Sequence, residues 1–396
     1  MLRYFTAGES HGEALVSLLS GMPAGLKIDT AYLDRELWRR QQGYGRGGRM
    51  KIETDRVHIL SGVRQGETIG SPIAILLENK DWKNWQEALP VGKGDAAAHR
   101  AVKSPRPGHA DLAGALKYNF PEARYVLERA SARESAARVA IGAIAKLFLQ
   151  ELGIEVLSHV LAVGNAALAS AEVEWEKIRA LADRDEVLLS CVDPETEQQM
   201  KAEVDRVLRT GDSVGGVFEV VAHKVPPGLG TYAQWDERLD GLLAGAVMSL
   251  QAVKAVEIGV GVAAATSPGS QVHDEIAFKR GGATGNSSLS GFHRKHNHAG
   301  GIEGGVSNGE DILVRGYLKP ISTLRRPLES VDFKTRQPVK AAYERSDVCV
   351  VPAAGVAAEA MVALTLARCA LEKFGGDSMT ETLRNFEGYR QQIREY

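Results

Sequence analysis

The sequence predicts an α+β protein in which one large domain spans residues 1–396 and contains an internal duplication. Three observations support this prediction. Segments with the alternation of strands and segments with the periodicity of helices are interspersed along the whole chain. Two short motifs occur once in each half of the chain. No Pro/Gly-rich linker separates the halves, so we expect them to share one body.

Composition places the chain among ordinary globular proteins, with 44% hydrophobic and 25% charged residues. A formal net charge of −2 argues against nucleic acid as a partner. The three cysteines Cys191, Cys349 and Cys369 are far apart and odd in number, which argues against a disulfide framework or a zinc site. Because the N-terminus has no long apolar run, we expect a cytoplasmic protein without signal peptide or membrane span.

The first predicted strands are Leu2–Thr6 and Ala14–Leu19, and a Gly-bounded polar turn lies between them. This turn contains Ser10 and His11. A Ser-His pair held between glycines on a tight loop is a candidate site for chemistry. The alternative is a strand-ending turn with its histidine in solvent, and these residues alone do not decide between the two.

A predicted helix at Tyr32–Gln41 ends with Arg40 and runs into a seven-residue stretch of glycines and arginines that includes Arg46 and Arg49. Glycines let the backbone approach a ligand, and interleaved arginines suit a polyanionic small molecule. The stretch lacks the Gly-Lys-Ser/Thr ending of a Walker loop. Flexible RNA-binding segments are also rich in Arg and Gly, but they are longer.

Two further strands are predicted at Val57–Leu60 and Ile73–Leu77, with a turn between them. The polar segment Lys80–His99, which contains two tryptophans, is expected to be a mobile surface loop. After it, a Pro-Gly turn brings Arg106 and His109 close together. A lone loop histidine is usually solvated, but the neighbouring cations favour a functional role for this one.

The stretch Glu128–Ser135 places two arginines and two serines at a predicted helix start. Ser131 and Glu134 have the spacing of a capping box, and apolar residues at helical spacing follow. The first-turn amides of this helix, flanked by Arg129 and Arg133, are predicted to bind a phosphate or a carboxylate. The alternative is a capped helix with solvated arginines.

Two motifs recur in the sequence. Arg64–Gly70 is echoed by Arg209–Gly215, and an apolar strand follows each of them. Met22–Leu26 is echoed by Val225–Leu229, and a helix follows each of these. The order of the two motifs differs between the halves, so a duplication is a hypothesis at this point.

The second half contains a predicted helix at Trp235–Leu250, a strand at Ala255–Val260 and an Ala-rich helix at Val356–Phe374. Between the last two, Gly300–Gly309 offers a backbone that can pass under a flat ring system. Lys319–Thr323 offers a cation, two hydroxyls and free amides, which suit a phosphate.

The Gly/Ser/His-rich segment Gly281–His298 is expected to be a loop over a site. His293, His296 and His298 lie within six residues and raise the question of a metal. Because no cysteine or carboxylate is near them in sequence, surface or cofactor-contacting histidines are the favoured interpretation.

Five loops of the chain carry arginines despite its net charge of −2, so a ligand with several negative charges is expected where they converge. His11, His109 and Asp347 are the candidates for proton transfer near neutral pH. The arginines are Arg40, Arg46 and Arg49; Arg106; Arg129 and Arg133; Arg325 and Arg326; and Arg345.

Three stretches carry a resemblance to the chorismate synthase family: Gly8–Gly12, Glu128–Gly142, and Arg345–Asp347 continuing to Glu359–Met361. The resemblance extends from end to end. Further matching stretches are Gly43–Met50, Arg106–Asp111, Gly300–Gly309 and Lys319–Thr323. One local departure is His296-Asn297-His298, where many relatives have Thr-Asn.

The resemblance implies a βαβ sandwich, usually assembled as a homotetramer. It implies conversion of 5-enolpyruvylshikimate 3-phosphate to chorismate and phosphate, a 1,4-anti-elimination of the shikimate pathway that makes aromatic amino acids. The family uses reduced FMN although the net reaction is redox neutral. The substrate carries one phosphate and two carboxylates, which agrees with the number of arginine-bearing loops.

The resemblance also implies residue roles. His11 would protonate the leaving phosphate, His109 would lie by the N1/O2 edge of the flavin, and Asp347 would relay a proton from N5. The substrate would be held by Ser10, His11, Arg40, Arg46, Arg49, Arg106, Ser131, Arg133 and Arg345. FMN would be held by Arg129, Ala130, Ser131, Gln251, Ala252, Asn297, Gly304, Lys319, Pro320, Ile321, Ser322, Thr323 and Arg345.

No Gly-x-Gly-x-x-Gly motif opens a βαβ unit in this chain, so we expect an external flavin reductase to supply reduced FMN, with NADPH as the indirect reductant. Two other functions are alternatives. One is a protein that binds a flavin or a nucleotide phosphate without lyase activity. The other is nucleic-acid binding through the Arg/Gly stretch, which the net charge disfavours.

Overall fold

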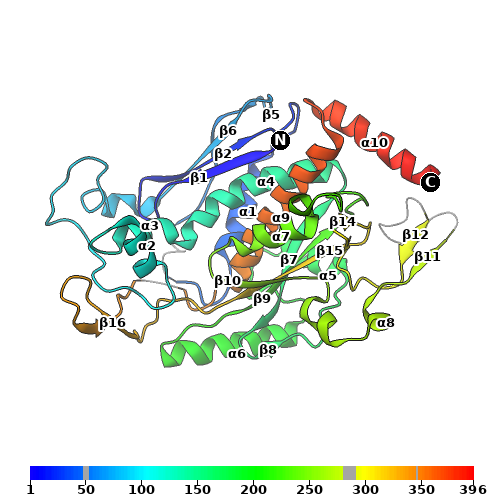
Figure 1. Ribbon diagram of the computed structural model, residues 1–396. Coiled ribbons are helices and arrows are strands. Elements are labelled where there is room, and N and C mark those ends of the chain that lie inside the picture. The colour runs from blue at the N-terminus through cyan, green and yellow to red at the C-terminus, as the bar shows by residue number, and fades with distance from the viewer. Residues whose placement is uncertain (48–52, 280–290, 345–346) are drawn as a thin grey trace.

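The computed structural model describes residues 1–47, 53–279, 291–344 and 347–396, and its core contains two antiparallel sheets (Figure 1). The first sheet has the strand order β1-β2-β6-β3, and the second has the order β10-β15-β9-β7-β8. Their bounds are β1 (Arg3–Ala7), β2 (Ala14–Ser20), β6 (Ile73–Glu78), β3 (His58–Ser61), β10 (Val253–Ile258), β15 (Ile312–Leu318), β9 (Gly216–His223), β7 (Glu155–Val163) and β8 (Ala166–Ala167).

Four helices lie between the two sheets: α1 (Thr30–Gln41), α4 (Ser135–Glu151), α7 (Leu239–Met248) and α9 (Val351–Phe374) (Figure 1). Helix α4 packs on β2 and β6, whereas α9 packs on β7 and β9. The two helices also pack on each other. A Cβ on Gly142 of α4 would lie 2.2 Å from the Cβ of Ala360, so their close approach requires glycine. The main core therefore fills the space between the sheets.

The periodicity predictions for the strands β1, β2, β3, β6, β9 and β10 and for the helices α1, α4, α7 and α9 are confirmed within a few residues. Several other elements were not predicted, among them β7 and β15. The remaining elements are β4 (Val63–Arg64), β5 (Glu67–Thr68), η2 (Lys80–Asn84), α2 (Asp111–Tyr118), α3 (Arg124–Ala130), η3 (Ala132–Glu134), α5 (Trp175–Ala182), α6 (Pro194–Thr210), η4 (Trp235–Glu237), η5 (Gly261–Thr266), α8 (Gly269–Val272), β11 (Ile276–Phe278), β12 (Phe292–Arg294), β13 (Ile302–Glu303), β14 (Val306–Ser307), β16 (Glu329–Val331), β17 (Pro338–Lys340) and α10 (Met379–Glu395).

The two sheets share one strand order, because β1-β2-β6-β3 corresponds to β7-β9-β15-β10. The motifs Met22–Leu26 and Val225–Leu229 occupy equivalent places after β2 and β9. In the first motif, the Thr68 hydroxyl donates to the proline carbonyl (2.6 Å) and accepts from the leucine N–H (2.9 Å). In the second, the Ser307 hydroxyl makes the same two bonds at 2.7 and 2.8 Å.

The proposed match of Arg64–Gly70 with Arg209–Gly215 is wrong. The first segment contains the β4-β5 hairpin, whereas the second is the end of α6 and its left-handed Gly211 cap. The hairpin β13-β14 is the structural counterpart of β4-β5, since each directly precedes the strand paired with β2 or β9. With this correction the motifs follow the same order in both halves.

Helix α9 is long and apolar enough to cross a membrane by length and composition alone. However, 78% of its 18-residue apolar window is buried in this structure, and core helices of soluble proteins pass the same test. In the described part of the chain, no other helix meets these criteria.

Candidate active site

The turn between β1 and β2 is anchored to α3. The Ser10 N–H donates to the Glu128 carbonyl (2.9 Å), and the His11 N–H donates to Glu128 Oε2 (2.7 Å). The other oxygen of this carboxylate lies 2.9 Å from His11 Nδ1. The predicted Ser-His turn is therefore held in place by a residue of the Glu128–Ser135 stretch, and His11 is only 12% exposed.

Two predicted substrate arginines converge on one buried carboxylate. Arg133 Nη1 donates to Asp55 Oδ2 at 2.6 Å, and Arg40 Nη1 lies 3.6 Å from the same oxygen. Arg40 Nη1 and Arg133 Nη2 are buried without a hydrogen-bond partner among the residues described. Burial lowers the pKa of Arg40 to about 10 despite the neighbouring Asp55. Unsatisfied buried guanidinium donors are the arrangement that a bound anion completes.

Asn79, at the end of β6, connects the His11 turn with Arg133. Its amide nitrogen donates to the carbonyls of Glu9 (3.1 Å) and Gly12 (2.8 Å), and its oxygen accepts from Arg133 Nε (2.9 Å). The side chain is nearly buried, with a residue exposure of 4%. Sequence reasoning missed this residue, although a polar side chain directly after an apolar strand is a signal for a site at a sheet edge.

Asp347 holds the Gly/Arg loop that follows α1. Its Oδ2 atom lies 3.2 Å from Arg46 Nη1, and its Oδ1 atom accepts from the Gly47 N–H at 2.5 Å. The predicted site residues Arg49 and Arg345 lie outside the described residues. The carboxylate expected to relay a proton is thus also a structural partner of a predicted substrate arginine.

A second histidine–carboxylate pair lies at the Pro-Gly turn. His109 Nδ1 is 2.6 Å from Asp111 Oδ1, and Arg106 Nε donates to the other oxygen of Asp111 at 2.8 Å. Arg106 Nη1 also donates to Thr323 Oγ1 at 2.9 Å. Burial alone would raise the pKa of Asp111, but hydrogen bonds from His109 and Arg106 hold it well below its usual value.

The Lys319–Thr323 loop lies against the same turn. Lys319 Nζ donates to Ser322 Oγ (2.8 Å), which donates to the Gly108 carbonyl (2.8 Å). No carboxylate lies within ion-pair distance of Lys319 in the described portion of the chain. Burial, together with Lys254, lowers the pKa of Lys319. A partly buried ammonium beside hydroxyls fits a phosphate group.

Glu134 connects predicted FMN residues of the two halves of the chain, because its carboxylate contacts both Arg129 and Gln251. Gln251 Nε2 donates to Glu134 Oε2 (3.1 Å), and the Ala252 carbonyl accepts from the Lys319 N–H (3.0 Å). Arg129 is 44% exposed and donates to backbone carbonyls of the β1 end. The structure therefore brings Arg129–Ser131, Gln251, Ala252 and the Lys319–Thr323 loop together.

Asn297 and Gly304 lie elsewhere in the chain. The Asn297 amide donates to the Asp311 carbonyl (2.8 Å) and accepts from the Gly301 N–H (2.7 Å), next to the first residue of β15. Lys319 follows the last residue of β15. Seven strand residues span about 20 Å, so the length of β15 separates Asn297 from Lys319 within one chain.

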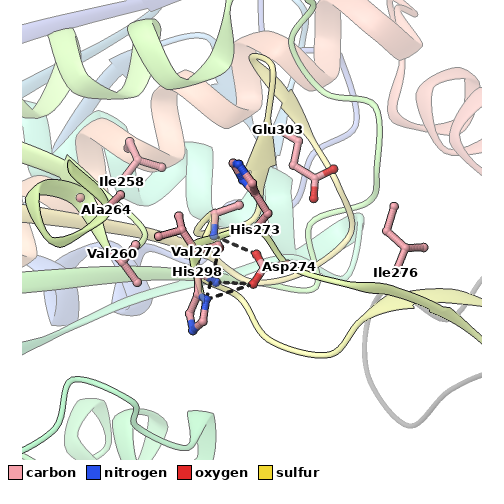
Figure 2. A pocket seen from close by; sticks show the side chains of 11 residues that line it. Ile258, Val260, Ala264, Val272, His273, Asp274, Ile276, His298 and Glu303 are labelled. Atoms are coloured by element: carbon pink, nitrogen blue, oxygen red, sulfur yellow. Dashed lines mark hydrogen bonds and ion pairs between the residues drawn. The ribbon is translucent and has the colours of Figure 1, made fainter. Parts of the chain in front are cut away.

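A pocket of about 440 Å³ lies at this other end of β15 and is shown in Figure 2. Asp274 lines it and accepts from the backbone N–H groups of His298 and Ala299, both at 2.9 Å. The His296 and His298 rings stack at 5.2 Å. Within the described ranges, no group of three or more His, Cys, Asp or Glu side chains is placed to hold a metal. None of the predicted catalytic residues lines this pocket.

Two local expectations were wrong. The Ser131 hydroxyl accepts from the Arg133 N–H (3.3 Å) instead of the Glu134 N–H, so the capping box does not form. The reason is that the Glu134 carboxylate is engaged by other side chains. The segment Lys80–His99 is not a loop throughout: it begins with η2, and Trp85 is buried with its ring 4.1 Å from that of His11.

Comparisons with known proteins identify the family of this chain. The family model described as chorismate synthase matches residues 2–371. Chorismate synthases of Koribacter versatilis and Acidobacterium capsulatum are 74% and 68% identical to this chain over 396 residues, with full coverage of both sequences. A crystal structure of chorismate synthase superposes with a TM-score of 0.78 at 40% identity, covering 100% of this chain and 99% of the other. The chain therefore belongs to the chorismate synthase family, lyases of the shikimate pathway that supplies the aromatic amino acids.

Proposed function

We propose that the chain converts 5-enolpyruvylshikimate 3-phosphate to chorismate and phosphate by an FMN-dependent 1,4-anti-elimination. The observation that carries this proposal is the pair of buried guanidinium groups of Arg40 and Arg133, whose unsatisfied donors lie next to the His11 turn. The substrate has one phosphate and two carboxylates, and Arg46 lies in the loop that follows α1 and its Arg40. Charge interactions of Arg40 with Arg133 and Arg46, and the Asn79 link between Arg133 and the His11 turn, support a shared substrate site for these four residues.

The residues also fit FMN. The ammonium of Lys319 has a hydroxyl neighbour and no described carboxylate partner, which suits the FMN phosphate. When bound in its reduced form, FMN would supply electron density to the substrate as its phosphate departs, and a base for the C6 proton. The residues that would hold it are Arg129, Ala130, Ser131, Gln251, Ala252, Lys319, Pro320, Ile321, Ser322, Thr323 and Arg345.

The remaining steps belong to side chains of this protein. His11 gives a proton to the leaving phosphate, whose negative charge Arg40 and Arg133 bind. Asp347 accepts the proton that the reaction releases on the flavin side. His109 would lie near the flavin, with its Nδ1 atom held by Asp111. The burial of Arg40 and Arg133 limits the access of water to their guanidinium groups and strengthens their charge interactions.

We also infer the assembly and supply of this enzyme. Because the length of β15, about 20 Å, separates Asn297 from Lys319, Asn297 and Gly304 would contact FMN bound to a neighbouring copy in a homotetramer. An external reductase supplies reduced FMN in the cytoplasm, with NADPH as its electron source. The shared strand order of two sheets around common helices supports a βαβ sandwich that arose by duplication.

An anaerobic assay with chemically reduced FMN tests the proposal. The expected result is chorismate and phosphate in equal amounts, with FMN still reduced at the end. A protein that only binds flavin would give neither product. A second assay, in air with NADPH and oxidised FMN, is expected to give little turnover. Substantial turnover there would contradict the need for an external reductase.

A further inference from the structure

We infer that Glu128 and Trp85 are positioning residues that fix the ring of His11 and select the nitrogen with which it acts. The inference rests on the proposed function for the role of His11 as proton donor. Its evidence is the set of contacts that surround the imidazole ring on two sides. Neither Glu128 nor Trp85 was singled out from the sequence.

Glu128 fixes one ring nitrogen. Its two carboxylate oxygens contact the N–H and the Nδ1 atom of His11 at 2.7 and 2.9 Å, and its side chain is 1% exposed. Arg124 Nη1 contributes a further contact to this carboxylate at 3.3 Å. Burial alone would raise the pKa of Glu128, but the hydrogen bonds and charge of His11 hold it below its usual value. The carboxylate is therefore ionised and accepts a hydrogen bond from the Nδ1–H group.

Trp85 fixes the plane of the ring. Its ring centroid lies 4.1 Å from that of His11, and the two planes are inclined by 30°. The indole is itself held in place: its Nε1 donates to Asp81 Oδ2 (3.1 Å), and the guanidinium of Arg100 lies 4.4 Å from its centroid. A stacking partner fixed in this way restricts rotation of the His11 ring about its Cβ–Cγ bond.

These contacts determine which nitrogen exchanges protons. A neutral imidazole carries one N–H, and an acceptor at Nδ1 keeps the proton there. The form of His11 that gives a proton to a leaving phosphate is therefore the imidazolium, in which both nitrogens carry hydrogen: the Nε2–H bond breaks, a phosphate O–H bond forms, and the neutral ring that remains keeps its Nδ1–H. The His109–Asp111 pair has the same Nδ1–carboxylate contact, so both proposed catalytic histidines have this arrangement.

The direct test is the protonation pattern of His11 in the full-length protein. Magic-angle-spinning NMR of ¹⁵N-histidine-labelled protein, with the His11 signals assigned by their loss in His11→Gln, is expected to show hydrogen on Nδ1. In Glu128→Gln the amide oxygen accepts from the His11 N–H and the NH2 group then faces Nδ1, so the proton is expected on Nε2. An unchanged pattern would overturn the inference, and this readout does not depend on any lyase activity.

Kinetics provide the second test. Glu128→Gln is expected to lower kcat by about 10²–10⁴-fold, the span of a positioned acid–base group, with KM and FMN binding nearly unchanged. In a His11→Gln background the same substitution should have no further effect, since Glu128 acts through His11. Additive losses would contradict this. Absence of turnover in the parent would instead refute the proposed function, whereas the NMR result would stand.

A matched control is Glu219→Gln on the second sheet. Glu219 is as buried as Glu128, and its Oε1 atom lies 3.1 Å from His159 Nε2, so the variant removes a carboxylate from a histidine outside the site. It is expected to lower the melting temperature without a comparable loss of kcat. Trp85→Leu should lower kcat, and Trp85→Phe, which restores an aromatic face, should recover most of it. Equal activity of these two variants would remove Trp85 from the inference.

Discussion

Replacing Glu359 by glutamine tests how the core holds the helices beneath the site. Glu359 lies on α9 and is fully buried. Its carboxylate accepts from Arg39 (2.7 and 2.8 Å), from Lys146 (2.7 Å) and from the N–H and hydroxyl of Ser158 (2.9 and 2.6 Å). Glu36 balances the same two cations at 2.8 and 2.6 Å. The network therefore joins α1, α4, α9 and β7.

The expected loss follows from the charges. Two carboxylates balance two cations, so Glu359→Gln leaves one positive charge buried without its partner. Breaking a buried ion pair in this way costs about 3–5 kcal/mol of unfolding free energy. Because Arg39 precedes Arg40 on α1, we also expect weaker substrate binding.

The assay is equilibrium or thermal unfolding at one fixed protein concentration, since subunit association contributes to stability. The control is the double variant Glu359→Gln/Lys146→Met, which removes one cation and should recover part of the loss. A loss below about 1 kcal/mol, or a double variant less stable than the single one, would refute the charge argument.

The difference in unfolding free energy between the parent and Glu359→Gln should depend on pH in a defined direction. Burial alone would raise the pKa of Glu359, but Arg39 and Lys146 hold it at about 2 in the folded protein. A depressed pKa contributes stability above the usual carboxylate value and loses it as pH falls. The difference between parent and Glu359→Gln should therefore be full near pH 7 and shrink as the pH falls from about 4.5 toward 2.

Three further predictions concern the site. Arg46→Ala should weaken substrate binding by about 1.5–3 kcal/mol and FMN binding far less, and unchanged substrate titrations would remove Arg46 from the site. Asp347→Asn should slow the chemical step by about 10²–10⁴-fold with both ligands still bound. A normal chemical step with weaker binding would instead assign Asp347 to holding Arg46. Asn79→Asp keeps the acceptor for Arg133 but loses both donors to the His11 turn, so kcat/KM should fall by about 5- to 150-fold; parent-like kinetics would exclude this link.

Local periodicity predicted much of the fold. The alternation of Ala14–Leu19 and the apolar spacing after Ser131 each placed an element within a few residues, because one face of each element is buried against the core. Strand β15 was missed, since Arg315 and Gly316 interrupt its apolar pattern. Arg315 pairs with Glu219 on the neighbouring strand at 2.7 Å, a long-range contact that no local pattern contains.

The sequence predicted which residue types form the site, but not which side chains form hydrogen bonds and ion pairs with one another. Loops rich in Arg, Gly and His indicated an anionic ligand before any family resemblance was used. Asp347 was predicted as a proton relay, and its pairing with Arg46, a residue of a distant loop, was not predicted. Ser131 does cap the short helix η3, but the reciprocal bond of the predicted capping box is missing because the Glu134 carboxylate is engaged by side chains from other elements. Such choices depend on tertiary packing.

The proposed elimination is tested most directly by following a single turnover. Single-turnover stopped-flow absorbance is followed after 5-enolpyruvylshikimate 3-phosphate is mixed anaerobically with the protein and pre-reduced FMN. We expect a transient change in flavin absorbance that decays as chorismate forms, followed by return to the spectrum of reduced FMN. Substrate binding with a static flavin spectrum and no chorismate would contradict the proposed elimination.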